Sequence, residues 1–311
     1  MPTTSIKRRV FLQGLAATNC LAAFSWPLAG FAAAEMLNVQ KLTDRISVIT
    51  GAGGNVVVYH GNQGLTLVDC GLSEHTTALL KLVDEISSKA PITTLFNTHW
   101  HEDHSGGNEA IHKRGTRIIA HENTRLWLGA DFDVEWRNWS HKPRPKEALP
   151  DQTFYVSGKH DVGGEIVEYL HFPQAHTDGD IALFFPDSNV LVAGGLLANG
   201  KYPVSDIATG GWIGGLIPAN AAILAKINDN TQIVPDRGPA RKKADLKAQH
   251  DMLADLFEKM KTRTREGAND HDMLKEKLTA DYDARFGNPE EFVMETYRGM
   301  WAHTYDMGGY I

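Results

Sequence analysis

Residues 99–104, which read HWHEDH, place three imidazoles and the carboxylate of Asp103 within six positions. Imidazole nitrogen is a preferred ligand of zinc. In an extended turn alternate residues project to one side, so His99 and His101 are expected to face one metal position, while Asp103 and His104 serve a neighbouring one. The alternative interpretation is a solvated polar loop. This spacing directly after an apolar strand makes that alternative the weaker one.

The chain resembles the metallo-β-lactamase superfamily through this cluster and through residues 175–180, which read AHTDGD. The resemblance extends over about residues 37–251. It implies the α/β (α+β) class and a four-layer αββα sandwich. It also implies a first metal position held by His99, His101 and His176, with a fourth place left for water, as in catalytic zinc sites. Taken alone, His176 is more typical of a loop histidine, but its neighbours favour a ligand.

The second metal position departs from the pattern of the family. Relatives carry an aspartate where this chain has Gly195 and a histidine where it has Arg237. The remaining pair, Asp103 and His104, offers too few ligands to hold zinc well against water. We therefore predict one zinc ion and regard a second as doubtful. We expect the guanidinium of Arg237 to pair with Asp103 and to replace part of the missing positive charge.

Four further aspartates have two interpretations each. Asp236 or Asp206 is a possible unorthodox oxygen ligand at the second position. Asp69 and Asp180 either orient metal-bound imidazoles from outside or belong to ordinary turns.

The predicted function is hydrolysis of a small carbonyl substrate, namely a lactam, lactone, ester or thioester, by metal-bound hydroxide. In this hypothesis Asp103 orients the water or carries its proton, and His104 or Arg237 contacts an anionic group of the substrate. The alternative is a degenerate family member that keeps one zinc and binds a small molecule or a partner without catalysis. The paired changes at Gly195 and Arg237 motivate this alternative.

Alternating and apolar runs predict the elements that position these residues. Strands are expected in residues 45–69, 93–97, 117–120, 166–171, 181–185 and 190–193. Helices are expected in residues 73–88, with Ser73 as the cap, and in 121–128, 240–261 and 272–280. The strand at 93–97 delivers the histidine cluster to its end. We assign residues 35–265 to the metallo-β-lactamase-fold domain and 266–311 to a helical C-terminal extension.

Two segments are expected to border the site. Residues 131–150 are polar and contain prolines, which indicates a loop that covers something. Residues 201–215 are rich in glycine and carry Trp212, which suggests a mobile wall of the pocket, with a core or membrane-facing position of Trp212 as the alternative. His121 is interpreted as a structural residue at a helix start.

Residues 1–34 are predicted to be a twin-arginine signal peptide, because Arg8 and Arg9 precede an apolar run and three alanines. Cleavage would leave a periplasmic protein without a stable membrane anchor, delivered by the twin-arginine export machinery. Loss of three basic residues takes the net charge from −7 to −10. This acidic balance argues against binding of nucleic acid. Cys70, the only thiol left, is interpreted as a buried apolar side chain.

Overall fold

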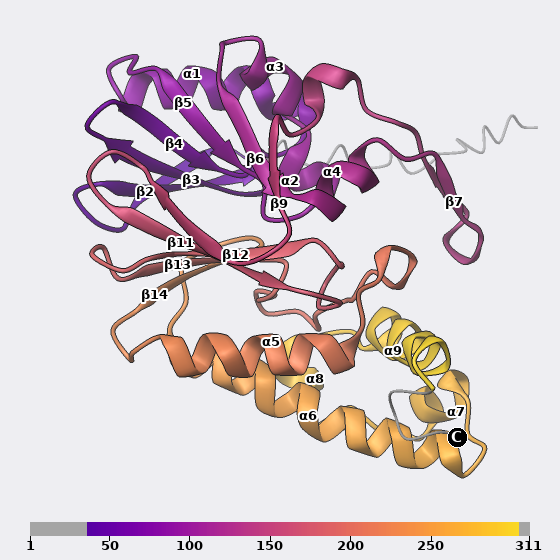
Figure 1. The fold of residues 1–311 in the computed structure, drawn as a ribbon. Coiled ribbons are helices and arrows are strands. Elements are labelled where there is room, and N and C mark those ends of the chain that lie inside the picture. The colour runs from indigo at the N-terminus through magenta and orange to yellow at the C-terminus, as the bar shows by residue number, and fades with distance from the viewer. Residues whose placement is uncertain (1–35, 305–311) are drawn as a thin grey trace, which may run out of the picture. The chain divides into compact units, whose positions relative to one another are not determined.

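The structure is a computed structural model that describes residues 36–304 (Figure 1). The predicted signal peptide, residues 1–34, lies outside the described residues. Within residues 36–304, no helix has both the length and the apolar character that crossing a bilayer requires.

The first half of the described chain builds a seven-stranded sheet with the order β1-β2-β3-β4-β5-β6-β9. Its strands are β1 (Asn38–Lys41), β2 (Ile46–Ala52), β3 (Gly54–Gly61), β4 (Gly64–Val68), β5 (Ile92–Phe96), β6 (Arg117–His121) and β9 (Gln152–Phe154). Strands β1 to β4 pair antiparallel, whereas β4, β5, β6 and β9 pair parallel. The parallel strands end at one edge of the sheet, so the loops after β4 and β5 meet there.

The second sheet has the order β10-β11-β12-β13-β14. Its strands are β10 (Gly158–Asp161), β11 (Ile166–Phe172), β12 (Asp180–Phe185), β13 (Val190–Gly194) and β14 (Gln232–Pro235). The two sheets face each other across a buried apolar layer that includes Val57 and Phe96 from the first sheet and Phe185 and Val234 from the second. Burial of this layer removes apolar surface from water and is the main force that holds the sheets together.

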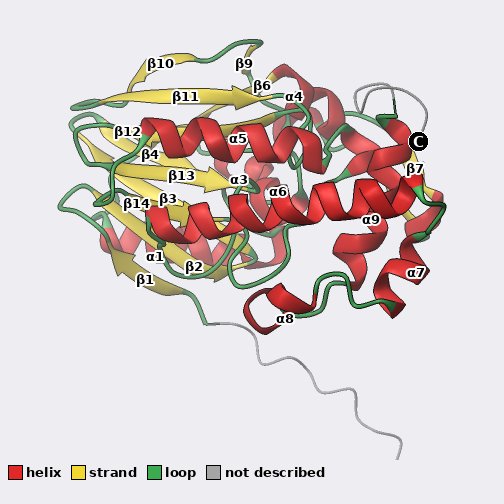
Figure 2. Cartoon of the chain, turned by 90° about the horizontal axis from the view of Figure 1, so that it is seen from below, coloured by secondary structure: helices red, strands yellow, loops and turns green. Residues whose placement is uncertain are grey.

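Helices cover the outer face of each sheet. The helices that follow first-sheet strands are α1 (Thr76–Ile86), α2 (Glu102–Ser105), α3 (Asn108–His112) and α4 (Glu122–Leu128). Helices α5 (Ile213–Lys226) and α6 (Lys243–Arg265) lie across the second sheet (Figure 2). Figure 1 shows the resulting order of layers as helix, sheet, sheet, helix. This is the αββα sandwich that the sequence predicts.

Three short helices complete the described chain: α7 (Asp270–Lys275), α8 (Ala280–Phe286) and α9 (Glu290–Ala302). Buried side chains of these helices, such as Met273, Phe286 and Met300, belong to the same apolar cluster as those of α5 and α6. The C-terminal helices therefore share the core of the second helical layer.

Some expected elements differ in the structure. A short 3-10 turn, Ser73–His75, precedes α1, and no side-chain cap bond is made there, so Ser73 is not the cap. The helix expected over residues 272–280 ends at Lys275 because the backbone turns left-handed at Lys277 (φ 55°). A new helix, α8, begins at Ala280.

The two segments expected near the site also differ. Residues 131–150 contain a hairpin, β7 (Phe132–Val134) and β8 (Trp139–His141), where a loop was expected. Trp212 is only 8% exposed and its ring stacks on His303 with 4.1 Å between centroids. It precedes the first residue of α5. The expectation that Trp212 belongs to a mobile wall is therefore wrong, and the alternative of a core position is confirmed.

Candidate metal centre

The loop after β5 brings three histidines to the edge of the first sheet. The backbone bends at residues 98–100, His101 is extended (φ −55°, ψ 145°), and α2 begins at Glu102. The predicted extended turn over the whole cluster is therefore wrong. Asp103 and His104 lie on the short helix, which places them where β3 begins and β4 ends, next to Gly54 and Asp69.

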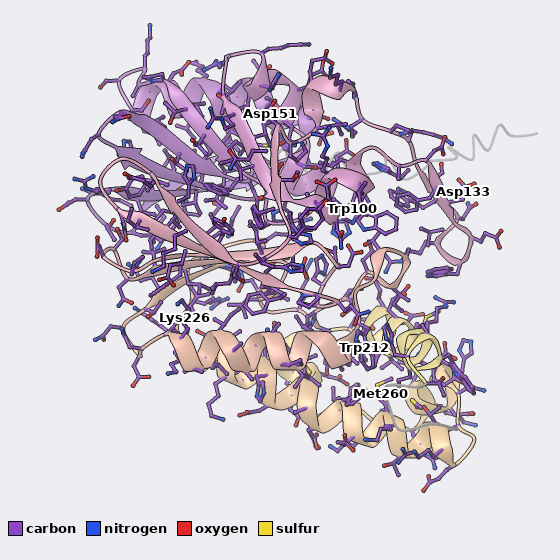
Figure 3. The ribbon with its side chains drawn as sticks, in the orientation of Figure 1. Trp100, Asp133, Asp151, Trp212, Lys226 and Met260 are labelled. Carbon is purple, nitrogen blue, oxygen red and sulfur yellow. The ribbon has the colours of Figure 1, made fainter. Side chains whose placement is uncertain are left out.

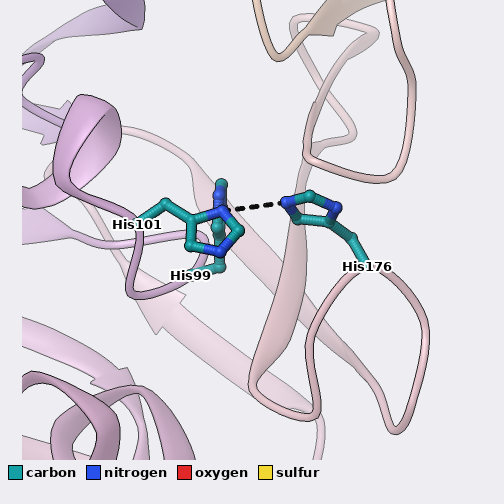
Figure 4. Close-up of side chains that lie close together, drawn as sticks. All are labelled: His99, His101 and His176. Carbon is teal, nitrogen blue, oxygen red and sulfur yellow. Dashed lines mark hydrogen bonds between the residues drawn. The ribbon is translucent and has the colours of Figure 1, made fainter. Parts of the chain in front are cut away.

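The imidazoles of His99, His101 and His176 converge, as Figure 4 shows. One ring nitrogen of each lies within 4.8 Å of those of the other two. The closest measured pair is His101 Nδ1 and His176 Nε2, which are 3.0 Å apart. Two nitrogens that each lie about 2.1 Å from the same ion are at most about 4.2 Å apart. A small closing movement of the three rings would therefore allow them to bind a single ion.

A hydroxyl and a carboxylate determine which nitrogen of His99 is free. The Thr98 hydroxyl donates its only hydrogen to Asp69 Oδ2 at 2.7 Å. It must therefore accept from His99 Nδ1–H, 3.0 Å away. This arrangement leaves a lone pair on His99 Nε2. Asp69 also accepts from the Thr98 backbone N–H at 2.7 Å, which holds the start of the loop in place.

Acceptors determine the free nitrogens of the other two rings in the same way. His176 Nδ1–H donates to the Val204 carbonyl at 2.6 Å. His101 Nε2–H donates to Asp206 Oδ2 at 2.9 Å. A carbonyl and a carboxylate can only accept, so the lone pairs lie on His176 Nε2 and His101 Nδ1. These two nitrogens face each other, and such a contact is favourable only with a proton or a metal ion between them.

Burial keeps two of the rings in the form that binds metal. It lowers the pKa of His99 well below its usual value, and neighbouring histidine charges lower it further. Burial, followed by the charge of His101, lowers the pKa of His176 to about 3. Neutral imidazole is the metal-binding form. The residues present therefore fit a metal ion that prefers nitrogen ligands.

His104 has a different environment from these three. Its side chain is 2% exposed, with Nδ1 2.8 Å from Asp69 Oδ2 and Nε2 3.4 Å from Asp103 Oδ2. Burial alone would lower the pKa of His104, but Asp103 and then Asp69 raise it to about 9. Both of its nitrogens face carboxylates, so His104 is held as a cation between two acids.

The predicted ion pair between Arg237 and Asp103 is present. Arg237 Nη2 lies 2.6 Å from Asp103 Oδ2, and the Arg237 side chain is half-exposed. Burial raises the pKa of Asp103, but the charges of His104 and Arg237 outweigh it and the pKa is lowered. Two cationic side chains thus surround the carboxylate that in relatives serves a second metal.

The absence of a side chain at Gly195 is matched by the position of His176. A Cβ atom added at residue 195 would lie 2.2 Å from His176 Cδ2 and 2.7 Å from its Cγ. The imidazole therefore occupies the space into which a carboxylate at this position would project. Among residues 36–304, the one group of three or more side chains able to hold a metal is His99, His101 and His176.

The four remaining aspartates separate into two groups. Asp206 Oδ2 accepts from His101 Nε2 and from the Thr209 hydroxyl at 2.7 Å, which makes it a partner of a ring in the first site, and its ligation of a second metal stays a prediction. Asp236 lines the same cavity as the histidines and accepts from the Arg237 N–H at 2.8 Å. Burial raises the pKa of Asp236. Asp236 lies beside the second position without completing a ligand set.

Asp180 acts on the loop that carries His176. It accepts hydrogen bonds from the N–H of His176 at 2.5 Å and from the N–H and hydroxyl of Thr177 at 2.8 Å each. It therefore fixes the backbone of the ligand rather than its ring. Sequence reasoning did not find Thr98 or Val204, and a backbone carbonyl such as that of Val204 leaves no signal in the side-chain pattern.

Two other residues match their sequence interpretation. His121 is the N-cap residue of α4, where its Nδ1 accepts from the Asn123 N–H at 3.2 Å. Cys70 is fully buried, and burial raises the pKa of its thiol. Neither side chain enters the histidine cluster.

A cavity of about 300 Å³ opens onto the three imidazoles. Its walls include Gly195, the segment 198–204 with Lys201, and Arg237. Glu291 of α9 completes one side. The C-terminal helices thus contribute to the site as well as to the core.

Comparison with known proteins gives one family and a group of similar folds. The model of the metallo-beta-lactamase superfamily matches residues 49–248. A metallo-beta-lactamase from Pontibacter korlensis is 20% identical, covers 70% of this chain and 99% of its own, and has a TM-score of 0.57. The stereoselective inverting sec-alkylsulfatase Pisa1 from Pseudomonas sp. is 17% identical, with a TM-score of 0.66, and covers 89% of this chain but 52% of its own. At these identities the likenesses concern the fold.

Proposed function

This chain belongs to the metallo-beta-lactamase superfamily, and from that premise we propose that it is a zinc-dependent hydrolase of small carbonyl substrates. Lactams, lactones, esters and thioesters are the proposed classes. The observation that carries the proposal is the convergence of His99 Nε2, His101 Nδ1 and His176 Nε2, each with its other ring nitrogen engaged by an acceptor. Such oriented, neutral imidazoles are typical of catalytic zinc sites.

Bound zinc supplies Lewis acidity and lowers the pKa of a water molecule to about 7. Asp103 stands beside this position with one oxygen held by Arg237. Its lowered pKa keeps it ionised, so it can orient water and take up a proton. The half-exposed guanidinium of Arg237 is available to an anionic group of the substrate. Buried His104 holds Asp103 instead of contacting substrate.

We propose that the centre holds one zinc ion. Arg237 and His104 supply positive charge where relatives hold a second ion, and His176 fills the space next to Gly195. Metal analysis of the purified chain after dialysis tests this. One tightly held zinc per chain is expected, whereas two would contradict the proposal.

The hydrolase proposal is tested with a panel of a lactam, a lactone, an ester and a thioester, each with and without added zinc. A secondary alkyl sulfate is included because a structurally similar protein is named as a sec-alkylsulfatase. We expect zinc-dependent turnover of a carbonyl substrate that is lost in His101→Ala. His250→Ala, on α6, is the matched control and keeps activity, because its partly exposed side chain contacts Asp251 and does not line the cavity over the three imidazoles. Turnover that persists in His101→Ala would refute the metal-centre assignment.

The second candidate is a binding protein that retains one zinc without catalysis. The paired changes at Gly195 and Arg237 favour it, because a single metal stabilises the leaving group less well than two. Zinc at one ion per chain with no turnover of any panel member is the result that supports this candidate. Turnover by the wild-type chain excludes it.

We also propose that the protein acts in the periplasm after export by the twin-arginine machinery, as Arg8 and Arg9 and the following apolar run suggest. The proposed partner is then a small-molecule substrate, and the acidic net charge disfavours nucleic acid.

A further inference from the structure

A second cavity, of about 690 Å³, shares His101 as a lining residue with the cavity that opens onto the three imidazoles. His101 and Asp206 belong to its wall. The remaining wall includes Trp100, Trp139 and His141. Figure 3 shows Trp100 on the side of the first sheet that faces the hairpin bearing Asp133. The cavity is therefore bounded by the sheet edge on one side and by hairpin β7–β8 on the other.

Two tryptophans and His141 form an aromatic part of this wall, beside Leu128 and Val134. The ring of Trp100 lies 5.0 Å from that of His141 and 6.1 Å from that of Trp139, measured between centroids. Phe132 packs behind both tryptophans, at 5.8 Å and 5.9 Å. Aromatic rings at such separations attract a further planar ring in offset or edge-to-face geometry. Trp139 is 45% exposed, so its ring still has surface to offer.

Hydrogen bonds connect this wall to a metal ligand. Trp100 Nε1–H donates to the Thr209 hydroxyl at 3.0 Å, which donates to Asp206 Oδ2 at 2.7 Å. Asp206 in turn accepts from His101. The floor of the aromatic cavity is thus fixed relative to the reacting centre, which is the requirement for positioning one molecule across both.

The hairpin is also fixed on its far side. Trp136 Nε1 and Arg137 Nε both donate to Glu295 Oε1 of α9, at 3.2 Å and 3.1 Å. The guanidinium of Arg298 lies 5.4 Å from the Trp136 ring. These contacts hold Trp139 in position over the cavity.

The cations at the rim are already neutralised. Arg144 pairs with Glu102 at 3.1 Å, and Lys142 pairs with Asp131 at 2.7 Å. Arg137 is engaged by Glu295. A ring bound against Trp139 therefore breaks none of these ion pairs.

We propose that this cavity binds an aromatic ring of the substrate, while the carbonyl group of the same molecule lies at the metal centre. This proposal rests on the proposed hydrolase function, because the bound ring belongs to a molecule that the enzyme would hydrolyse. The substrate class that follows is an aryl or arylalkyl lactam, lactone, ester or thioester. Trp139 is a specificity-determining residue, and it takes no part in the bond-breaking step.

The test measures binding of phenylacetate and of its saturated analogue cyclohexylacetate by calorimetry, with zinc-loaded and zinc-free protein. Both probes carry the same carboxylate, so their difference reports the ring. We expect phenylacetate to bind about two- to tenfold more tightly. Trp139→Ala removes this preference and Trp139→Phe keeps most of it. Trp301→Ala, with a comparably exposed tryptophan on α9 that is outside the cavity wall, leaves it unchanged.

Equal affinity for the two probes in the wild-type protein overturns the inference. So does a preference that survives Trp139→Ala, or that Trp301→Ala abolishes equally. Failure of the proposed function is recognised separately: preferential binding of phenylacetate without turnover of any aryl ester leaves the cavity assignment intact and refutes the hydrolase. Turnover of an aryl ester by a protein that binds the two probes equally refutes the cavity assignment and leaves the hydrolase proposal intact.

Discussion

Substitution of Gly195 by alanine is predicted to weaken metal binding through a steric contact alone. The new Cβ would lie 2.2 Å from His176 Cδ2, whereas ordinary contacts begin at 3.4 Å. The imidazole must therefore retreat by about 1.2 Å, the difference between those distances. Metal–ligand distances tolerate only about 0.2 Å, so the ring ceases to be a ligand.

The expected loss of zinc affinity in Gly195→Ala is larger than the loss caused by changing a residue that only orients a ligand. Altering a partner that orients a ligand costs about 10- to 100-fold in metal affinity, and displacing a ligand itself should cost at least about 100-fold, or about 2.7 kcal/mol. The unfolding free energy of the zinc-free protein should fall by about 1–3 kcal/mol, as for other overpacked sites.

The assay is a zinc titration in competition with a chromophoric chelator, paired with urea unfolding of the zinc-free protein. Gly129→Ala is the matched control, because an added Cβ there meets atoms no closer than 3.6 Å. It should change neither quantity substantially. Zinc affinity of Gly195→Ala equal to that of the wild type would refute the reasoning, because His176 would then not be a ligand in the observed position.

Five further predictions concern the surroundings of the site and the export signal. Asp206→Asn keeps the shape but removes the charge that orients His101, so zinc affinity measured by the same titration should fall about 10- to 100-fold; an unchanged affinity contradicts this role. Asp69→Ala removes the nearer of the two carboxylates that face buried His104 and should lower the unfolding free energy by about 3–5 kcal/mol, and a loss below about 1 kcal/mol argues against the pair. Arg237→Ala breaks a half-exposed ion pair and should lower the unfolding free energy in urea by only about 0.2–1 kcal/mol. The double variant Gly195→Asp, Arg237→His should gain no second zinc in metal analysis, because His176 occupies the space next to residue 195. Replacement of Arg8 and Arg9 by lysine should retain the protein in the cytoplasm by cell fractionation, and continued export would exclude the twin-arginine route.

The position of the histidine cluster was predictable because it depends on residues that are neighbours in the sequence. The spacing of His99, His101 and His104 and the apolar strand before them suffice to place the cluster at a strand end. The pairing of Arg237 with Asp103, 134 residues away, was predicted because the resemblance to the family places both residues at the second metal position. Opposite charges near a common position have few other partners there.

Contacts that depend on the folded shape were not predictable. Nothing in the residue types indicates that His176 lies against Gly195, or that Asp206 bonds to His101. The exact extent of the short α2 also escaped the alternation argument, because a single helical turn is too short for a periodic pattern.

Some fold elements were missed for a similar reason. Helix α5 begins with glycines and contains Pro218, which are poor helix formers, and packing against α6 overrides that preference. The hairpin β7–β8 has strands of three residues each, shorter than the runs from which strands are recognised. Tertiary contacts, including those to Glu295, select its conformation.

The central claim is that three imidazoles hold one metal ion, and anomalous diffraction at the zinc edge from crystals of the zinc-loaded protein tests it most directly. We predict one peak at about 2.0–2.1 Å from His99 Nε2, His101 Nδ1 and His176 Nε2, with no second peak between Asp103 and Arg237. Absence of a peak at the three histidines, or a metal held by other side chains, would contradict the account.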